Sequence, residues 1–181
     1  GNSAMLRTAT VNTFFSANDN EWEHVTVVVD APNNKVIFYK DGGPNGGVNG
    51  SKTEVDLVSQ PSHLYKEMQN TTANVTIGNY HETFLDGAFE GKMSNLIVFK
   101  QTTSQSALND SDVLELYNEG FAYDYSNHSK FAQAVSWWKL DNNPRAEEGH
   151  IAANSINTAL SGTYKTCTPG SKMTLVDDAP T

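Results

Sequence analysis

The chain has 181 residues, a formal net charge of −9 and 18% charged residues, and its length suits one domain with or without an appendage. No cluster of Lys or Arg occurs, which excludes recognition of nucleic-acid phosphates and disfavours an anionic membrane surface as partner. No apolar run is long enough to predict a membrane span, and a single cysteine, Cys167, excludes an intrachain disulfide.

Two strand-like stretches near the start of the chain predict a β-hairpin. Residues 22–30 and residues 35–42 are rich in β-branched and aromatic side chains, and the turn residues 32–34 separate them. An earlier stretch, residues 5–15, also has the Thr and aromatic content of a strand. Alternation in the first hairpin strand places three valines on one face: Val25, Val27 and Val29.

Loops and further strands follow the hairpin. The Gly- and Asn-rich residues 42–52 predict a loop. Apolar and polar residues alternate over residues 89–99, which predicts a strand with one buried face. Four residues of that strand form the predicted buried face: Phe89, Met93, Ile97 and Phe99. Additional short strands are predicted at residues 53–58, 73–79, 135–140 and 173–176.

One short helix is predicted after residue 109. Asn109 suits the N-cap position, and Asp112 three residues later can complete a capping box. Gly120 is the predicted C-terminal stop. Antiparallel strands with alternating faces and a single short helix predict an all-β fold, in which two sheets bury their apolar faces against each other as a sandwich.

Several stretches of the chain, taken in order, resemble the laminin G-like, concanavalin A-like lectin and glucanase family. The stretches that carry the resemblance are residues 22–30, 36–42, 75–78, 89–99 and 113–120. The resemblance implies an antiparallel two-sheet jelly-roll sandwich over residues 1–120. It also implies that His24 is a packing residue of a strand rather than a metal ligand.

The sequence departs from the family pattern at both ends of the matching region. Family members have several more strands before the one that contains Trp22, so a partner chain or a preceding segment is expected to complete the sandwich. Residues 121–181 form a predicted C-terminal extension with a strand around Trp137 and Trp138, which packs on or completes the sandwich. This extension loosely resembles the tail that follows such domains in some phage structural proteins.

Loop aromatic residues are the candidate contact surface. On the rim of a sandwich they can stack on a sugar or contact a protein, although packing under the loops is the more ordinary role for them. The candidates for ligand binding are Tyr80, His81, Phe84, Tyr123, Tyr125 and Trp138. Of the adjacent Trp137 and Trp138, one is expected to face outward unless both sides of the strand are covered.

Calcium is a possible cofactor that the resemblance implies. Laminin G-like members often hold one such ion at the edge of the sandwich through Asp, Asn and backbone carbonyl oxygens. The matching loop carboxylates in this chain are Asp19, Asp41 and Asp86. Solvated surface charge is the alternative role of these residues.

The sequence favours a non-enzymatic recognition or assembly module of a larger virion or cell-surface structural protein, outside the cell or on the virion surface. It would bind glycans or neighbouring subunits through its rim loops. One alternative is a purely structural capsid or tail component with no soluble ligand. Another is a polysaccharide hydrolase or lyase, which would need paired carboxylates; Glu21 and Glu23 share a strand face, but the glucanase run of acidic residues is absent.

Overall fold

The computed structural model describes eight stretches of the chain and divides the chain into two compact units. The described residues are 21–57, 77–78, 91–101, 106–121, 123–140, 151–152, 156 and 162–163. The described residues of the first unit fall within 1–68 and 101–132, and those of the second unit fall within 69–100 and 133–179. Each unit is treated separately below.

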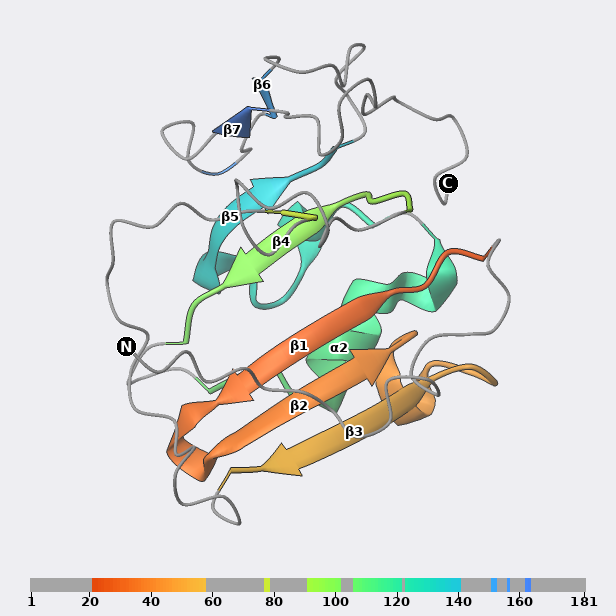
Figure 1. The fold of residues 1–181 in the computed structure, drawn as a ribbon, viewed down its shortest axis with the longest axis vertical. Coiled ribbons are helices and arrows are strands. Elements are labelled where there is room, and N and C mark those ends of the chain that lie inside the picture. The colour runs from red at the N-terminus through yellow and green to blue at the C-terminus, as the bar shows by residue number, and fades with distance from the viewer. Residues whose placement is uncertain are drawn as a thin grey trace. The chain divides into compact units, whose positions relative to one another are not determined.

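The first unit contains an antiparallel sheet of three strands in the order β1-β2-β3 (Figure 1). The strands are β1 (Val25–Asp30), β2 (Lys35–Lys40) and β3 (Ser51–Asp56). The predicted hairpin is confirmed, since β1 pairs with β2 from Val25 opposite Lys40 to Asp30 opposite Lys35. A 3-10 turn, η1 (Ala31–Asn33), closes it, and Asn34 leaves the turn with a φ of 52°, a left-handed conformation that Asn tolerates.

Helix α2 (Asp110–Tyr117) packs against one face of this sheet and forms the core of the first unit. Strand residues at alternate positions supply the sheet side of that core, and the segment before the helix adds two partly buried side chains. Among the described residues, this core consists of Val28, Ile37, Tyr39 and Val113, with Ala107 and Leu108 packed against it. Complete burial of a side chain such as Val113 stabilises the fold by about 1.5–3 kcal/mol.

The opposite face of β1 is more exposed. Its three alternating valines, Val25, Val27 and Val29, are 43%, 52% and 42% exposed, whereas Val28 is only 6% exposed. The predicted division of this strand into two faces is therefore confirmed, and the better-buried face is that of Val28. This face points toward the helix because Ile37 and Tyr39 of β2 lie on the same side of the sheet.

The glycine-rich loop between β2 and β3 turns back tightly on itself through a 3-10 turn, η2 (Gly43–Asn45). Gly46 must be glycine because a Cβ there would lie 1.5 Å from the carbonyl oxygen of Asp41. Gly42 has a φ of 76°, and a Cβ on it would lie 2.7 Å from Cδ1 of Tyr117. The loop therefore lies close to helix α2, and its prediction from Gly and Asn content is confirmed.

The N-terminus of α2 has the predicted capping box. The Asn109 Oδ1 atom accepts hydrogen bonds from the backbone N–H groups of Ser111 (2.9 Å) and Asp112 (3.1 Å), and Asp112 Oδ2 accepts from the Asn109 N–H (2.9 Å). The predicted C-terminal stop of the helix, Gly120, lies two residues after the observed C-cap. Asn118, with a φ of 48°, is the left-handed C-cap, and a 3-10 turn, η4 (Asn118–Gly120), follows it. Further 3-10 turns are η5 (Tyr125–Asn127) and η6 (Phe131–Gln133).

In its described residues, the second unit contains two small antiparallel pairs. Strand β4 (Leu96–Phe99) pairs with β5 (Ala134–Trp138), with a bulge between Val98 and Phe99. Strand β6 (Ile151–Ala152) pairs with β7 (Gly162–Thr163).

The predicted strand over residues 89–99 was too long. Residues 91–95 are irregular, Asn95 has a φ of 59°, and Met93 is 40% exposed instead of buried. A left-handed residue interrupts the regular alternation of a strand, so the extended conformation starts only at Leu96. The Trp137 indole Nε1–H donates to Asn95 Oδ1 (2.7 Å), which fixes this irregular residue beside β5.

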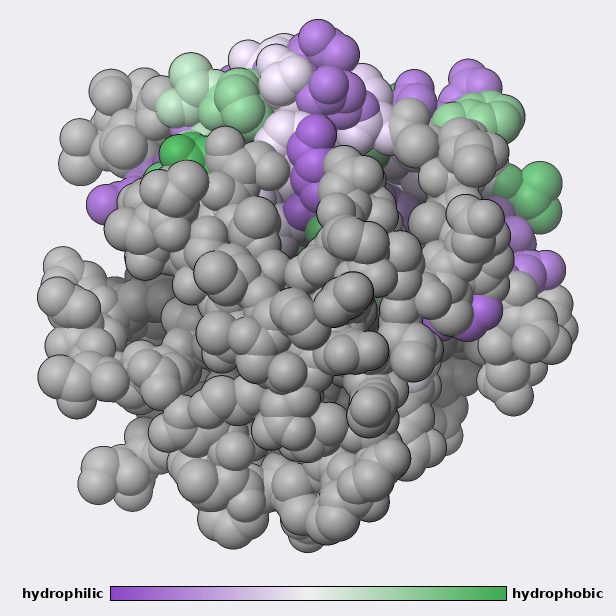
Figure 2. All heavy atoms as spheres, turned by 90° about the horizontal axis from the view of Figure 1, so that it is seen from above, coloured by the Kyte–Doolittle hydropathy of each residue, from purple (hydrophilic) through white to green (hydrophobic). Residues whose placement is uncertain are grey.

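The described residues thus form antiparallel sheets with a single α-helix among them. The finer prediction of a jelly-roll sandwich, and the division into residues 1–120 and 121–181, stay predictions. The predicted strands at residues 5–15 and 173–176 lie outside the described residues. On the face shown in Figure 2, described hydrophobic residues lie in small separate groups beside hydrophilic ones. Among the described helices, none is long and apolar enough to cross a membrane.

Candidate functional site

The first unit contains a pocket with a volume of about 270 Å³. It lies between the turn of the β1–β2 hairpin, the helix-facing side of β2 and β3, and the segment that leads into α2. Its lining residues are Asp30, Pro32, Asn33, Ile37, Tyr39, Lys52, Gln101, Ser106, Ala107, Leu108, Asn109 and Asp110. The lining thus combines apolar side chains, amides, hydroxyl groups and charges.

Strand register and the helix cap position the three central polar residues of the pocket. Tyr39 lies two positions after Ile37, so both side chains are on the helix-facing side of β2. Lys52 is directly opposite Tyr39 in the β2–β3 register and therefore shares that side. Asp110 is the first residue of α2, immediately after the N-cap Asn109, so the capping box holds its position.

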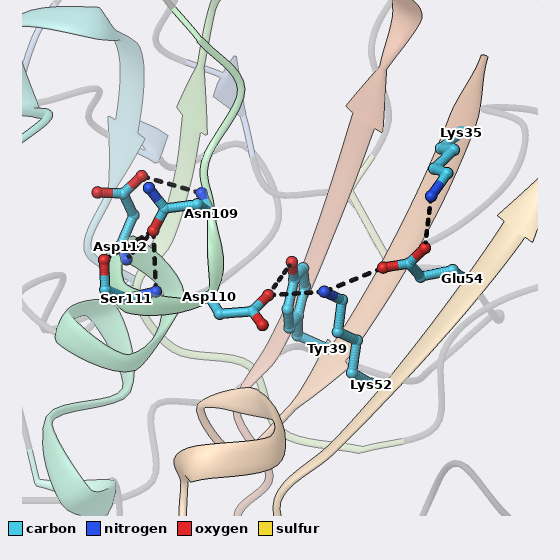
Figure 3. Close-up of polar contacts among 8 residues, drawn as sticks. All are labelled: Lys35, Tyr39, Lys52, Glu54, Asn109, Asp110, Ser111 and Asp112. Atoms are coloured by element: carbon cyan, nitrogen blue, oxygen red, sulfur yellow. Dashed lines mark hydrogen bonds and ion pairs between the residues drawn. The ribbon is translucent and has the colours of Figure 1, made fainter. Parts of the chain in front are cut away.

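These residues form a continuous chain of polar contacts, which we call the Asp110 cluster: Asp110, Tyr39, Lys52, Glu54 and Lys35 (Figure 3). Asp110 Oδ1 accepts hydrogen bonds from the Tyr39 hydroxyl (2.8 Å) and from Lys52 Nζ (2.8 Å). Lys52 also pairs with Glu54 Oε1 (3.0 Å), and its Nζ atom lies 5.4 Å from the centre of the Tyr39 ring. Lys35 pairs with the other oxygen of Glu54 (2.9 Å).

The cluster fixes the protonation state of its members. Burial, followed by the hydrogen bond to Asp110, raises the pKa of Tyr39 to about 12. The hydrogen bond with Asp110 raises the pKa of Lys52, and the same bond lowers the pKa of Asp110. At neutral pH the tyrosine is therefore neutral, the lysine charged and the aspartate ionised. A general acid or base works best with a pKa near the operating pH, so these three groups are suited to binding rather than to proton transfer.

A second set of contacts surrounds Glu115 on the other side of α2. Its carboxylate accepts hydrogen bonds from the Tyr123 hydroxyl (2.9 Å), the Ser129 N–H (3.0 Å) and the Ser129 hydroxyl (2.7 Å). His128 is buried, and its Nδ1 accepts from the Lys130 N–H (3.0 Å), so its Nε2–H donates to the Asp112 carbonyl (2.9 Å). These bonds attach the segment after the helix to the helix itself.

The predicted aromatic contact residues are only partly described. Tyr80, His81 and Phe84 lie outside the described residues. Tyr123 and Tyr125 lie together in the first unit with their ring centres 5.9 Å apart, and Tyr125 is 5% exposed. Burial raises the pKa of Tyr125 to about 12.

Trp138 lies in the second unit, on β5. Both adjacent tryptophans are buried, with Trp137 5% and Trp138 9% exposed, so the strand is covered on both sides. This is the exception that the alternation rule allowed, and it leaves little of the Trp138 ring open to a ligand. The role of the aromatic residues as a contact surface stays a prediction.

Of the three predicted calcium ligands, only Asp41 is described. Its carboxylate accepts the backbone N–H of His24 (2.9 Å), and its own N–H donates to the His24 carbonyl (2.8 Å). Burial raises the pKa of Asp41, which is 7% exposed. Asp19 and Asp86 lie outside the described residues. In the described part of the chain, no group of three His, Cys, Asp or Glu side chains is placed to hold a metal ion.

His24 is a packing residue, as expected. Burial lowers its pKa to about 4, and its ring lies 5.9 Å from that of Tyr117. Its Nδ1 atom is buried without a hydrogen-bond partner among the described residues.

The residues of the pocket were not identified as a site from the sequence. Tyr39 and Asp110 are 71 positions apart, and no local spacing indicates that they meet. The sequence features that could have indicated the pocket were indirect. Lys52 follows the glycine-rich loop and pairs with Tyr39 across β2 and β3, and Asp110 follows the N-cap Asn109. A scan against protein-family models and searches of curated proteins and solved structures gave no match to this chain. The resemblance to laminin G-like proteins therefore stays a prediction.

Proposed function

We propose that this chain is a non-enzymatic recognition module that holds a small polar ligand, such as one sugar unit of a glycan, in the pocket beside the Asp110 cluster. The volume of about 270 Å³ is slightly below that of pockets for drug-sized ligands, roughly 300–1,000 Å³, and suits a single ring. Apolar side chains, amides and a few fixed charges are the lining that such sites require.

The observation that carries the proposal is the geometry of the Asp110 cluster beside the pocket, whose lining includes Tyr39, Lys52 and Asp110. Tyr39, Lys52 and Asp110 hold one another in fixed positions at 2.8 Å, with pKa values shifted away from neutrality. Preorganised polar groups lose little conformational entropy when a ligand binds.

The wider setting remains that of a larger virion or cell-surface structural protein, with a jelly-roll fold that a partner chain or another segment completes. The scarcity of charged residues and the abundance of turn residues support this setting. Neighbouring subunits are the second class of ligand, and the exposed valines of β1 offer apolar surface for them.

The hydrolase or lyase alternative needs two free carboxylates in a cleft. Glu23 is paired with Lys40 at 2.7 Å, and both side chains are largely buried, which speaks against a catalytic role for Glu23. An activity screen on β-glucans and alginates, with Glu21→Gln and Glu23→Gln variants, tests the alternative. Turnover that these changes abolish would replace the binding proposal.

The binding proposal is tested by ligand-observed NMR with a panel of monosaccharides, in buffers with EDTA and with calcium. Ser106 is exposed and lines the pocket, so Ser106→Trp should fill the pocket from its rim and abolish binding. Val48→Trp adds the same indole at a fully exposed position outside the pocket and should leave binding unchanged. No binding by the unsubstituted chain in either buffer, or equal binding by both variants, would refute a sugar site in this pocket.

A further inference from the structure

The charges that line the pocket are unbalanced. Among the described lining residues, Asp30 and Asp110 contribute two carboxylates, and Lys52 is the single Lys or Arg. The ammonium group of Lys52 is already committed, since it contacts Asp110 Oδ1 (2.8 Å) and Glu54 Oε1 (3.0 Å) and lies over the ring of Tyr39. An anionic ligand would therefore meet two carboxylates and a lysine whose charge is already balanced.

Both lining carboxylates keep an oxygen that accepts no hydrogen bond from the described residues. Asp110 receives the Tyr39 hydroxyl and Lys52 on the same atom, Oδ1, and Figure 3 shows its other oxygen directed away from both donors. Asp30 receives the side-chain amide of Asn33 on Oδ2 (2.8 Å), which leaves Oδ1. The Asp110 side chain is 42% exposed, so its second oxygen can be reached from solvent.

The lining offers weaker partners for the rest of a ligand. Gln101 and Ser106 add an amide and a hydroxyl group, and Ile37 and Leu108 add apolar surface. The side-chain oxygen of Asn109, Oδ1, accepts the hydrogen bonds of the helix cap. The side-chain NH₂ group of Asn109 therefore remains as a donor. A sugar ring has hydroxyl groups for these amides and an apolar face for the aliphatic side chains.

We infer that the pocket selects an amino sugar, whose protonated amine is attracted to the lining carboxylates of Asp30 and Asp110, over the neutral and acidic sugars of the same ring. The inference rests on the proposed function, because it names the ligand class of the same pocket. Hydrogen bonds between an ammonium group and a carboxylate are about twice as strong as neutral ones. A uronic acid would instead place its carboxylate beside like charges, which is destabilising.

The test compares three sugars that differ mainly in charge: glucosamine, glucose and glucuronic acid, each titrated by NMR chemical-shift changes in low salt. We expect glucosamine to bind about fivefold more tightly than glucose, the gain that a partly exposed ion pair of about 1 kcal/mol gives, and glucuronic acid to bind most weakly. Added salt should reduce the advantage of glucosamine, because salt screens exposed charges. n-Butylamine is a fourth ligand, which represents a lysine side chain of a partner protein without a sugar ring.

Asp30→Asn keeps the shape of the side chain and removes its charge. It should reduce the ratio of glucosamine affinity to glucose affinity, and an unchanged ratio would refute the role of the Asp30 carboxylate. Glu21→Gln removes one negative charge from an exposed residue outside the pocket and should leave the ratio unchanged.

The outcomes separate the two proposals. If glucose and glucuronic acid bind as well as glucosamine, the selectivity for an amine is wrong while the sugar site stands. If n-butylamine binds as tightly as glucosamine, the recognised group is a lysine-like amine and the amino-sugar assignment is overturned. If none of the three sugars binds, the proposed function fails as well.

Discussion

The hydrogen bond between the Tyr39 hydroxyl and Asp110 gives the most direct test of the fold around the pocket. Tyr39 is 1% exposed, and its hydroxyl donates to Asp110 at 2.8 Å. Tyr39→Phe keeps the ring in the core and removes only this bond. A hydrogen bond to a charged group contributes about 1.5–3 kcal/mol. Asp110 keeps Lys52 and is partly exposed, so it can be hydrated, and we expect a loss at the lower end, about 1.5 kcal/mol.

The assay is urea denaturation followed by tryptophan fluorescence, with the free energy of unfolding extrapolated to water. The thermal midpoint should fall by about 3–6 °C for a protein of this size. Tyr117→Phe is the matched control, since no hydrogen bond of its hydroxyl occurs among the described residues, and it should cost less than about 0.5 kcal/mol. Equal losses in the two variants would refute the assignment of this bond.

Two further predictions concern helix α2. Asn109→Ala removes the N-cap and should lower the free energy of unfolding by about 1 kcal/mol, whereas Asn109→Asp should restore most of it in the same urea experiment. Burial raises the pKa of Glu115, but its hydrogen bonds from Ser129 and Tyr123 outweigh this effect and lower the pKa below its usual value. The ionised, hydrogen-bonded Glu115 carboxylate therefore stabilises the folded chain above the unfolded-state pKa of about 4.3, and this stabilisation is lost as pH falls through the lower folded-state pKa. Accordingly, Glu115→Gln should be less stable than the unsubstituted chain at pH 6, and the gap should shrink toward pH 3; a gap that stays constant would contradict this role.

Local features of the fold could be predicted from the sequence. The hairpin depends on two β-branched runs with a Pro-Asn-Asn turn between them, and the capping box depends on Asn109 and Asp112 three positions apart. In each case the residues that decide the structure are neighbours in the chain. The C-terminal end of α2 was missed by two residues because Asn118, like glycine, can take the left-handed conformation that ends a helix.

Non-local features could not be predicted in this way. The strand predicted at residues 89–99 is shortened because Asn95 takes a left-handed conformation beside Trp137, which comes from a distant part of the chain. The pocket depends on the register of β3 against β2 and on the placement of α2 over the sheet, neither of which follows from a single stretch of sequence. Tyr39 and Lys52 were therefore not associated with Asp110 before the structure brought them together.

The separation of 71 positions between Tyr39 and Asp110 also has a kinetic consequence. The contacts of Glu115 span only 8 to 14 positions, so the chain can form them after closing a short loop. Contacts between distant positions carry a larger entropic cost of loop closure and tend to form late. We therefore expect Asp110→Asn to accelerate unfolding and leave the folding rate nearly unchanged, as measured by stopped-flow fluorescence. A ligand in the pocket would then act mainly by slowing the first step of unfolding, so occupancy would lengthen the lifetime of the folded chain.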